Sequence, residues 1–332
     1  LTLLTALHQQ VRRTIRRFGL CPPGTRVLVA LSGGSDSVGL ATLLTDLSEH
    51  GDFTVVGLAH LNHQLRESAD RDEQFCRDFS QKIGVPIQIA RGGVKSHATE
   101  HTVSIEEAAR TIRYSYLMEA AASCGADRIA VGHTQDDQAE TFLMKLMRGA
   151  GPSGLAGIYP QRGLVIRPLL EVSRAQLRAF LESRQLDWVE DETNEDVTNP
   201  RNRIRHRVLP ELARALGGDP RPAIARAAGI IREDAEWLDG QADEQFGRVC
   251  RRTDSGWACD ADQLAALPGP LEARVLRRVL RELAGEREVS QEHVEAARAV
   301  AHGVDRAADV PGGRVERSRQ TVVLIERKAA PK

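Results

Sequence analysis

Short apolar runs alternate with amphipathic segments along the first half of the sequence. Four runs rich in β-branched and aliphatic residues predict buried strands over residues 26–31, 53–59, 85–90 and 127–132. Between and after these runs, apolar residues recur at helical spacing and predict helices over residues 37–48, 68–83, 104–123 and 135–148. Strands that alternate with crossover helices indicate an α/β fold, in which a mostly parallel sheet is covered by helices on both faces.

The pattern changes after about residue 170. An acidic segment over residues 187–196 precedes a basic one over 201–207, and Gly217-Gly-Asp-Pro-Arg-Pro222 marks a boundary. Beyond it, an Ala-, Arg- and Glu-rich sequence predicts helices over residues 223–245, 271–284 and 291–301, and a small hairpin from residues 310–314 and 321–325. We therefore predict an α/β domain over residues 1–216 and a smaller, mainly helical domain over residues 217–332.

The composition is that of a globular protein, because 41% of the 332 residues are hydrophobic and 27% are charged. No run of about twenty apolar residues occurs, so we expect no membrane-spanning segment. The N-terminal residues lack the pattern of a signal peptide, and the five cysteines (positions 21, 76, 124, 250 and 259) include no Cys-x-x-Cys pair. We therefore expect reduced thiols and a cytoplasmic location.

The formal net charge of −1 means that any nucleic-acid binding depends on local basic patches.

The strongest functional signal is Ser32-Gly-Gly-Ser-Asp-Ser37, which directly follows the first predicted strand. Its glycines let the backbone approach a ligand closely, and its hydroxyls and the first N–H groups of the next helix form an anion cradle. A plain strand-to-helix turn is the alternative, and the complete six-residue pattern disfavours it. The cradle is not a Walker loop, because Gly-Lys-Ser/Thr is absent from the sequence. A carboxylate at Asp36, directed at phosphates, needs a cation between them and predicts a Mg²⁺ ligand, although an Asp that only stabilises the helix N-terminus is also common.

A second group of polar residues begins where the fourth predicted strand ends. His133 comes first, and Asp136, Asp137 and Glu140 follow in the first turns of the next helix. The carboxylates share a helix face, so their repulsion must be offset by a cation such as Mg²⁺ or the ammonium group of a substrate. Helix-dipole capping with solvation is the alternative.

Arginines supply candidate anion-binding groups. Arg110 and Arg113 lie on one predicted helix face, and Arg201-Asn-Arg-Ile-Arg-His-Arg207 carries arginines on two faces, which favours a surface that follows a phosphate backbone over a solvated helix face.

Two further patterns carry less weight. His60 and His63 form a His-x-x-His pair without a third ligand nearby, so a polar strand end near a ligand is favoured over a zinc site. Gly149-Ala-Gly-Pro-Ser-Gly154 fits a dinucleotide fingerprint but follows a helix instead of a strand, which indicates a helix terminus and a loop.

The Ser-Gly-Gly-x-Asp-Ser loop resembles that of the PP-loop ATP pyrophosphatases, a superfamily with a Rossmann-like fold. More specifically, the sequence resembles the tRNA(Ile)-lysidine synthetases. The matching segments occur in family order between about residues 26 and 210: His60-Leu-Asn-His-Gln-Leu-Arg66, Glu107-Ala-Ala-Arg-x-x-Arg-Tyr114, Gly132-His-x-x-Asp-Asp-Gln-Ala-Glu-Thr141, Arg148-Gly-x-Gly-x-x-Gly-Leu155, Arg167-Pro-Leu-Leu170, and Asp191-x-x-Asn194 leading to Arg201-Asn-Arg-Ile-Arg-His206.

The resemblance implies a two-step ligation. ATP adenylylates the C2 oxygen of the wobble cytidine in the isoleucine tRNA with a CAU anticodon, and pyrophosphate leaves. Free lysine then attacks C2 through its ε-amine, expels AMP and forms lysidine. ATP and Mg²⁺ would be the cofactors, the second domain would bind tRNA, and a homodimer is compatible with the family.

The resemblance also assigns roles. It implies catalytic roles for Asp36, Arg113, His133, Asp137 and Arg205, and nucleotide binding by Ala30, Ser32, Gly33, Gly34, Ser35, Asp36, Ser37 and His60. Lysine binding falls to Asp136, Asp137 and Glu140, metal binding to Asp36 and Asp137, and RNA binding to Arg201, Arg203, Arg205 and Arg207.

Two alternatives stay open. The first is another PP-loop enzyme; a tRNA thiolase of the best-known kind would need paired Cys-x-x-Cys cysteines, and an amidotransferase-type synthetase would need a glutaminase domain with its nucleophile motif. The second is an RNA-binding module that has lost catalysis, which the intact Asp36, His133 and Asp137 disfavour.

Overall fold

The chain forms two units, Leu1–Arg232 and Glu233–Lys332, and the division between them lies within helix α11 (Arg221–Val249). The computed structural model describes residues 5–326 apart from 65–68, 95–98, 100, 102–103, 191–197 and 286. The predicted domain boundary between residues 216 and 217 remains a prediction. None of the helices described has an apolar stretch long enough to cross a bilayer.

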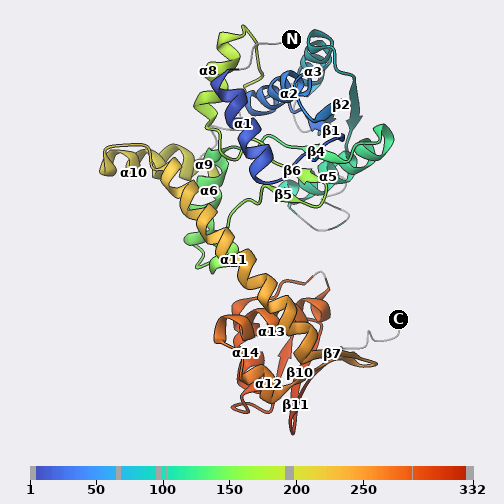
Figure 1. Ribbon diagram of the computed structural model, residues 1–332, viewed down its shortest axis with the longest axis vertical. Coiled ribbons are helices and arrows are strands. Elements are labelled where there is room, and N and C mark those ends of the chain that lie inside the picture. The colour runs from blue at the N-terminus through green and yellow to red at the C-terminus, as the bar shows by residue number, and fades with distance from the viewer. Residues whose placement is uncertain are drawn as a thin grey trace. The chain divides into compact units, whose positions relative to one another are not determined.

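The first unit is built on a six-stranded sheet with the order β3-β2-β1-β4-β6-β5 (Figure 1). All neighbouring strands in it are parallel except β5 and β6, which pair antiparallel. The predicted parallel α/β fold is therefore confirmed, and each predicted strand forms, although the fourth is shorter than expected. The strands are β1 (Thr25–Ala30), β2 (Phe53–Asn62), β3 (Ile87–Arg91), β4 (Arg128–Ala130), β5 (Gln161–Arg162) and β6 (Val165–Ile166).

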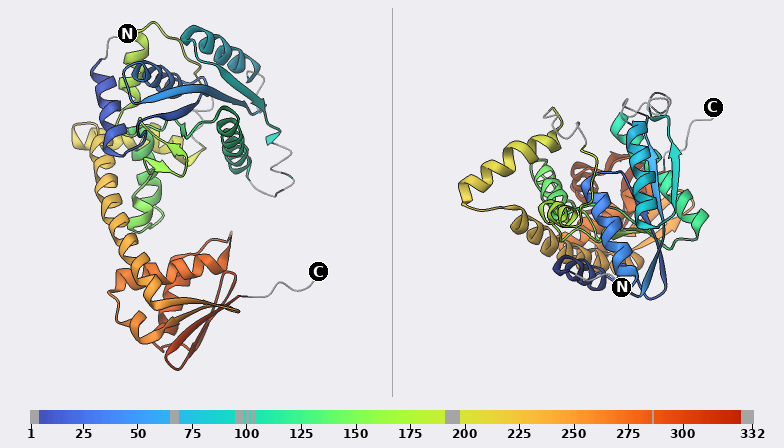
Figure 2. Two further views of the ribbon diagram at one scale, coloured as in Figure 1. Left: turned by 45° about the vertical axis from the view of Figure 1, so that its right-hand side comes forward. Right: turned by 90° about the horizontal axis from the view of Figure 1, so that it is seen from above.

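Helices cover both faces of this sheet. Because successive side chains of a strand point to opposite faces, Val27 and Val29 of β1 join one core and Leu28 joins the other. The first core includes apolar residues from α1 (Ala6–Arg17), α2 (Ser35–Ser48), α3 (Ala69–Ile83) and α8 (Arg174–Ser183). The second is formed with α5 (Ile105–Cys124), which lies across the strands from α2 (Figure 2).

The strand order places a ligand crevice at β1 and β4. The chain moves outward from β1 to β2 and β3 and then returns to add β4 on the other side of β1. In such sheets, ligands bind outside the carboxyl ends of the strands at the point where the order reverses. Helix α2 starts directly after β1, with Gly34 as its N-cap, and α6 (Gln135–Leu146) starts after β4, with Thr134 as its N-cap.

Shorter elements complete this unit: α7 (Pro152–Leu155), α9 (Pro200–Arg203), the π-helix η2 (Ile204–Val208) and α10 (Leu209–Leu216). The glycine-rich segment 149–154 runs from the end of α6 into α7, so it is a loop after a helix, as predicted.

The second unit combines helices with an antiparallel sheet of order β7-β8-β11-β10-β9. The predicted terminal hairpin is confirmed, but it belongs to a larger sheet that the sequence did not predict. The elements are β7 (Cys250–Thr253), β8 (Gly256–Asp260), α12 (Ala261–Ala265), α13 (Gly269–Ala284), α14 (Gln291–Ala301), β9 (Ala307–Val310), β10 (Gly313–Ser318) and β11 (Thr321–Glu326).

The expectation of five reduced cysteines was wrong for two of them. Cys250 and Cys259 form a disulfide, while Cys21, Cys76 and Cys124 are thiols. The two paired cysteines lie directly opposite each other in the antiparallel ladder of β7 and β8. A sequence separation of nine residues does not suggest this pairing unless the hairpin itself is predicted.

Candidate active site

The loop between β1 and α2 has the geometry that its sequence predicts. Gly33 adopts a positive φ of +89°, and a Cβ placed there would lie 3.4 Å from the side chain of Val189. The backbone N–H of Ser32 donates to the hydroxyl of Ser37 at 3.1 Å, and this hydroxyl donates to the Gly34 carbonyl at 3.0 Å. These bonds close the loop at the start of α2, where N–H groups are available to an anion.

A cavity of about 440 Å³ opens beside this loop, at the carboxyl ends of β1, β2 and β4. The predicted site residues that line it are Ala30, Ser32, Asp36, Ser37, His60, Arg113 and His133. Gly33, Gly34 and Ser35 belong to the same loop but are not part of the cavity lining. Residues that are far apart in sequence therefore meet at one edge of the sheet, and the cavity is large enough for a nucleotide-sized ligand.

His60 is held by the end of the first strand. Its Nδ1 lies 2.9 Å from the Leu31 carbonyl, which can only accept, so Nδ1 carries the proton and Nε2 is an acceptor. Nε2 is buried and has no hydrogen-bond partner among the described residues. Burial lowers the pKa of His60. The zinc alternative gains no support, because the described residues contain no cluster of three potential metal-binding side chains.

His133 lines the cavity and precedes Thr134, the N-cap of α6. Burial lowers its pKa from 6.5 to about 4, even though the Asp137 carboxylate acts in the opposite direction. The imidazole is therefore neutral at pH 7, and its buried Nδ1 has no partner among the described residues. A neutral imidazole can exchange hydrogen bonds with a ligand but does not add a positive charge to the site.

The acidic residues of α6 are buried. Glu140 is 0% exposed, and Asp136 and Asp137 are less than a tenth exposed. The second carboxylate oxygen of Asp137 (Oδ2) accepts from the backbone N–H of Thr134 at 2.8 Å and from its hydroxyl at 3.0 Å. Asp136, Asp137 and Asp36 all lie in the first turns of α6 and α2, where the positive end of the helix dipole favours carboxylates.

Arg174 contacts both Asp36 of α2 and the acidic residues of α6. Its Nε donates to Asp36 at 3.0 Å and its Nη2 donates to Asp137 at 3.0 Å. Its backbone N–H donates to Asp136 at 2.8 Å, and its Nη1 lies 3.7 Å from Glu140. Arg174 was not among the residues predicted from the sequence. The one available signal was the capping box of Ser173 and Gln176, which indicates that a helix begins at Arg174 but not what the arginine contacts.

Two arginines of the basic segment also face the acidic residues. Arg201 donates to Asp137 at 3.0 Å and to Glu140 at 2.8 Å, and Arg205 donates to Glu140 at 2.6 Å. Burial alone would raise the pKa of Asp137, but Arg174 and Arg201 outweigh it and lower this pKa. The cation that the acidic group was expected to need is thus provided, in this structure, by guanidinium groups.

Arg203 and Arg207 are exposed, whereas Arg201 and Arg205 are partly buried. The predicted division of the basic segment into two faces is confirmed, and RNA binding by these four arginines stays a prediction. Of the segments that carried the family resemblance, Arg66, Asp191 and Asn194 lie outside the described residues.

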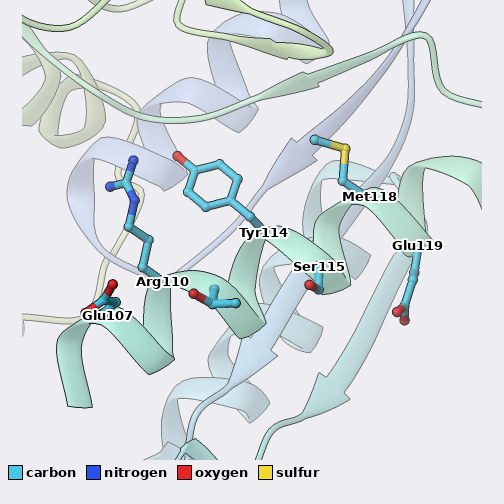
Figure 3. Close-up of a pocket in the computed structure, with 7 residues that line it drawn as sticks. Glu107, Arg110, Tyr114, Ser115, Met118 and Glu119 are labelled. Carbon is cyan, nitrogen blue, oxygen red and sulfur yellow. The ribbon is translucent and has the colours of Figure 1, made fainter. Parts of the chain in front are cut away.

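Arg113 and Arg110 occupy different hollows on α5. Arg113 lines the central cavity, while Arg110 lines a separate hollow together with Glu107, Tyr114 and Met118. Figure 3 shows Arg110 and Tyr114 side by side on this face of α5. The guanidinium carbons of Arg110 and Arg113 lie 5.2 Å and 5.4 Å from the centre of the Tyr114 ring. Of the two, Arg113 is the one positioned to contact a ligand in the central cavity.

Two protein families match the chain. A family described as PP-loop domain matches residues 4–212, and one described as TilS substrate binding domain matches residues 260–323. In the solved structures, the U34-tRNA thiolase NcsA of Methanococcus maripaludis has a similar fold, with a TM-score of 0.56 and 17% identity over 68% of this chain and 78% of that chain.

Curated relatives match over most of the chain. A tRNA(Ile)-lysidine synthase of Geobacter sulfurreducens is 37% identical over 97% of this chain and 68% of its own length. A tRNA(Ile)-lysidine synthase of Salinispora tropica is 40% identical over 91% of both chains. The resemblance inferred from the sequence is therefore confirmed, and the chain belongs to the tRNA(Ile)-lysidine synthase family of PP-loop ligases.

Proposed function

We propose that the chain attaches free lysine to C2 of the wobble cytidine in tRNA(Ile) with a CAU anticodon, at the expense of ATP. One observation carries this proposal: Asp36 lines the nucleotide-sized cavity and shares Arg174 with Asp137 of the acidic group. This arrangement supports an ATP site that lies next to a site for the ammonium group of lysine. A ligase that uses ATP and lysine in successive steps needs this proximity.

In the first step, the C2 oxygen of the cytidine attacks the α-phosphorus of ATP. A new P–O bond forms, the bond to the β-phosphate oxygen breaks, and pyrophosphate leaves. The loop from Ser32 to Ser37 holds the phosphates, and Arg113 offsets the negative charge that grows on the α-phosphate. Neutral His133 exchanges hydrogen bonds with the reacting groups.

Mg²⁺ fits this site through the chemistry of its donor set. It prefers oxygen ligands and often binds through one or two carboxylates together with substrate phosphates. Asp36 offers a carboxylate at the cavity wall, beside the phosphate-binding loop. Asp137, the second predicted ligand, accepts from Thr134, Arg174 and Arg201. Asp36 accepts from one arginine, Arg174, and from the hydroxyl of its neighbour Ser35, so the contacts favour Asp36. When bound there, the ion would neutralise phosphate charge.

In the second step, the ε-amine of lysine attacks C2, the C2–O bond breaks and AMP leaves. The amine must first lose a proton from its ammonium form, and the carboxylate that faces this group, Asp137 or Glu140, would accept that proton. Asp137 and Glu140 are paired with Arg174, Arg201 and Arg205, so lysine binds by exchange. The ε-ammonium group of lysine forms an ion pair with one of these carboxylates. The carboxylate of lysine then pairs with the arginine that is released. The ε-ammonium group and the carboxylate of the ligand are then both paired, which limits the cost of burying these two charges.

The remaining predicted partners belong to the same proposal. Arg203 and Arg207 present exposed positive charge to the RNA backbone. A cytoplasmic location, where ATP, lysine and tRNA are all available, and a homodimeric assembly complete the prediction.

Lysine incorporation tests the proposed function. Unmodified tRNA(Ile) with a CAU anticodon is incubated with the chain, ATP, Mg²⁺ and radiolabelled lysine. We expect label in the RNA, with AMP and pyrophosphate released in amounts equal to the lysine incorporated. A transcript that differs only by uridine at the wobble position is the matched control and should stay unlabelled. Incorporation without ATP, or equal labelling of both transcripts, would contradict the proposal.

A further inference from the structure

We infer that Arg174 is a positioning residue that fixes the nucleotide-loop carboxylate Asp36 relative to the acidic residues of α6. This inference rests on the proposed function and adds a residue to it. The guanidinium group contacts Asp36 on one side and Asp137 on the other, both at 3.0 Å. It therefore connects the loop that would hold ATP to the carboxylates that would hold lysine.

The contacts depend on the shape of the guanidinium group. Nε and Nη2 donate to carboxylates of two different helices, and Nη1 faces Glu140 at 3.7 Å. A planar fork with fixed donor directions can hold these carboxylates at set positions, whereas an ammonium group is a single point charge on a flexible stem. Only 19% of the Arg174 side chain is exposed, so water screens these contacts weakly.

The backbone of Arg174 is also fixed. It is the first residue of α8, and Ser173 caps this helix by accepting from the Gln176 N–H at 3.2 Å. The Arg174 N–H donates to Asp136 at 2.8 Å, and the Gln135 N–H donates to the Val172 carbonyl at 2.9 Å. The start of α8 is thus bonded directly to the start of α6.

Helix α8 is also packed tightly against α2, which carries Asp36. A Cβ at Gly39 of α2 would lie 3.0 Å from the Leu177 side chain, so the two helices approach closely. Arg174 consequently reaches Asp36 and Asp137 from an element that is anchored to both of their helices. Such anchoring is the structural requirement for a group that holds others in place.

The consequence for the reaction follows from charge. Asp36, Asp137 and Glu140 are close enough to share one guanidinium group. Without it, Arg201 and Arg205 would still compensate Asp137 and Glu140, but Asp36 would lose its ion pair and be repelled by the charge of Asp137. Removal of the Arg174 side chain should therefore let Asp36 turn away from the phosphate position. It should also leave Asp137 and Glu140, the carboxylates proposed to bind lysine, less ordered. Both half-reactions should suffer, although Arg174 is not assigned a bond-making role.

The test compares Arg174→Gln and Arg174→Lys with Arg17→Gln as a matched control. Arg17 forms an exposed ion pair with Glu171 at 2.9 Å on the same unit. Two assays are run on the full chain: adenylylation of tRNA(Ile) from α-labelled ATP without lysine, and lysine transfer in the complete reaction. Circular dichroism and thermal unfolding verify folding, and filter binding measures the Kd for tRNA.

We expect Arg174→Gln to lower kcat for adenylylation by about tenfold or more and to raise the KM for lysine by a similar factor, with the Kd for tRNA within about twofold. Arg174→Lys should have a kcat between those of Arg174→Gln and the parent chain, because lysine keeps the positive charge but lacks the planar set of guanidinium donors. Arg17→Gln should match the parent chain.

Full activity of folded Arg174→Gln would overturn the inference, and so would a defect confined to one half-reaction. Equal impairment of the Lys and Gln variants together with a lower unfolding temperature would show a structural role only. A parent chain that incorporates no lysine would instead refute the proposed function, so the two failures are distinguishable.

Discussion

Gly132 packs directly against the backbone of Asp36. A Cβ at residue 132 would lie 3.1 Å from both the carbonyl carbon and the carbonyl oxygen of Asp36, and 3.3 Å from the Ser37 nitrogen. These are backbone atoms at the start of a helix, so they cannot move aside as the end of a flexible side chain can. A side chain at residue 132 would therefore push the segment after β4 and the phosphate loop apart by a few tenths of an ångström.

Gly132→Ala should displace the phosphate loop. We expect kcat/KM for ATP in the adenylylation assay to fall by about tenfold or more, since small displacements at a reacting centre have large effects on rate. Gly151→Ala is the matched control, because its φ is negative and a Cβ there would meet nothing within 4 Å. Comparable activity in the two variants would show that the close approach at Gly132 is not needed.

The cavity residues could be predicted because local patterns fix their place in the sheet. Apolar runs with crossover helices indicate parallel strands, and the carboxyl ends of parallel strands lie at one edge. Residues that directly follow the first, second and fourth predicted strands, such as Asp36, His60 and His133, must therefore come together. The structure places all three in one cavity lining.

The partners of the arginines could not be predicted in this way. Arg174 is 138 residues from Asp36 and follows none of the predicted strands, so only tertiary packing brings the two together. The sequence indicates that Arg201 and Arg205 share a helix face, but not that this face meets Glu140. The disulfide of Cys250 and Cys259 was missed for the same reason, because it depends on a hairpin of short, partly polar strands.

Asp36→Ala should abolish turnover while tRNA still binds. Asp36 lines the cavity beside the phosphate loop, and its removal takes away the carboxylate proposed to hold Mg²⁺. We expect adenylylation to fall by about a hundredfold or more, and excess Mg²⁺ should restore little of it. Filter binding should give a Kd for tRNA within about twofold of the parent value. A parallel failure to bind tRNA would mean that Asp36 has a structural role.

The low pKa of His133 should make the free energy of unfolding depend on pH. The imidazole has a pKa of about 4 in the folded chain and about 6.5 when exposed, so between these values only the unfolded chain binds the proton. The contribution of His133 to stability is therefore complete above pH 6.5 and is lost as the pH falls towards 4. Urea unfolding at pH 7 and pH 5 should show a larger decrease in the free energy of unfolding for the parent chain than for His133→Asn. Equal decreases would indicate that His133 titrates normally in the folded chain.

Arg203 and Arg207 should contribute to tRNA binding but not to ATP binding. Both are exposed, whereas Arg201 and Arg205 are paired with carboxylates. Replacing both with Gln should weaken tRNA binding and reduce the slope of log K against log salt by about two, roughly one for each phosphate that is no longer neutralised. The KM for ATP should stay constant, because neither residue lines the cavity. Arg13→Gln with Arg16→Gln, two exposed arginines of α1, is the matched control for net charge. If the control pair weakens binding equally, total charge and not the position of Arg203 and Arg207 governs the interaction.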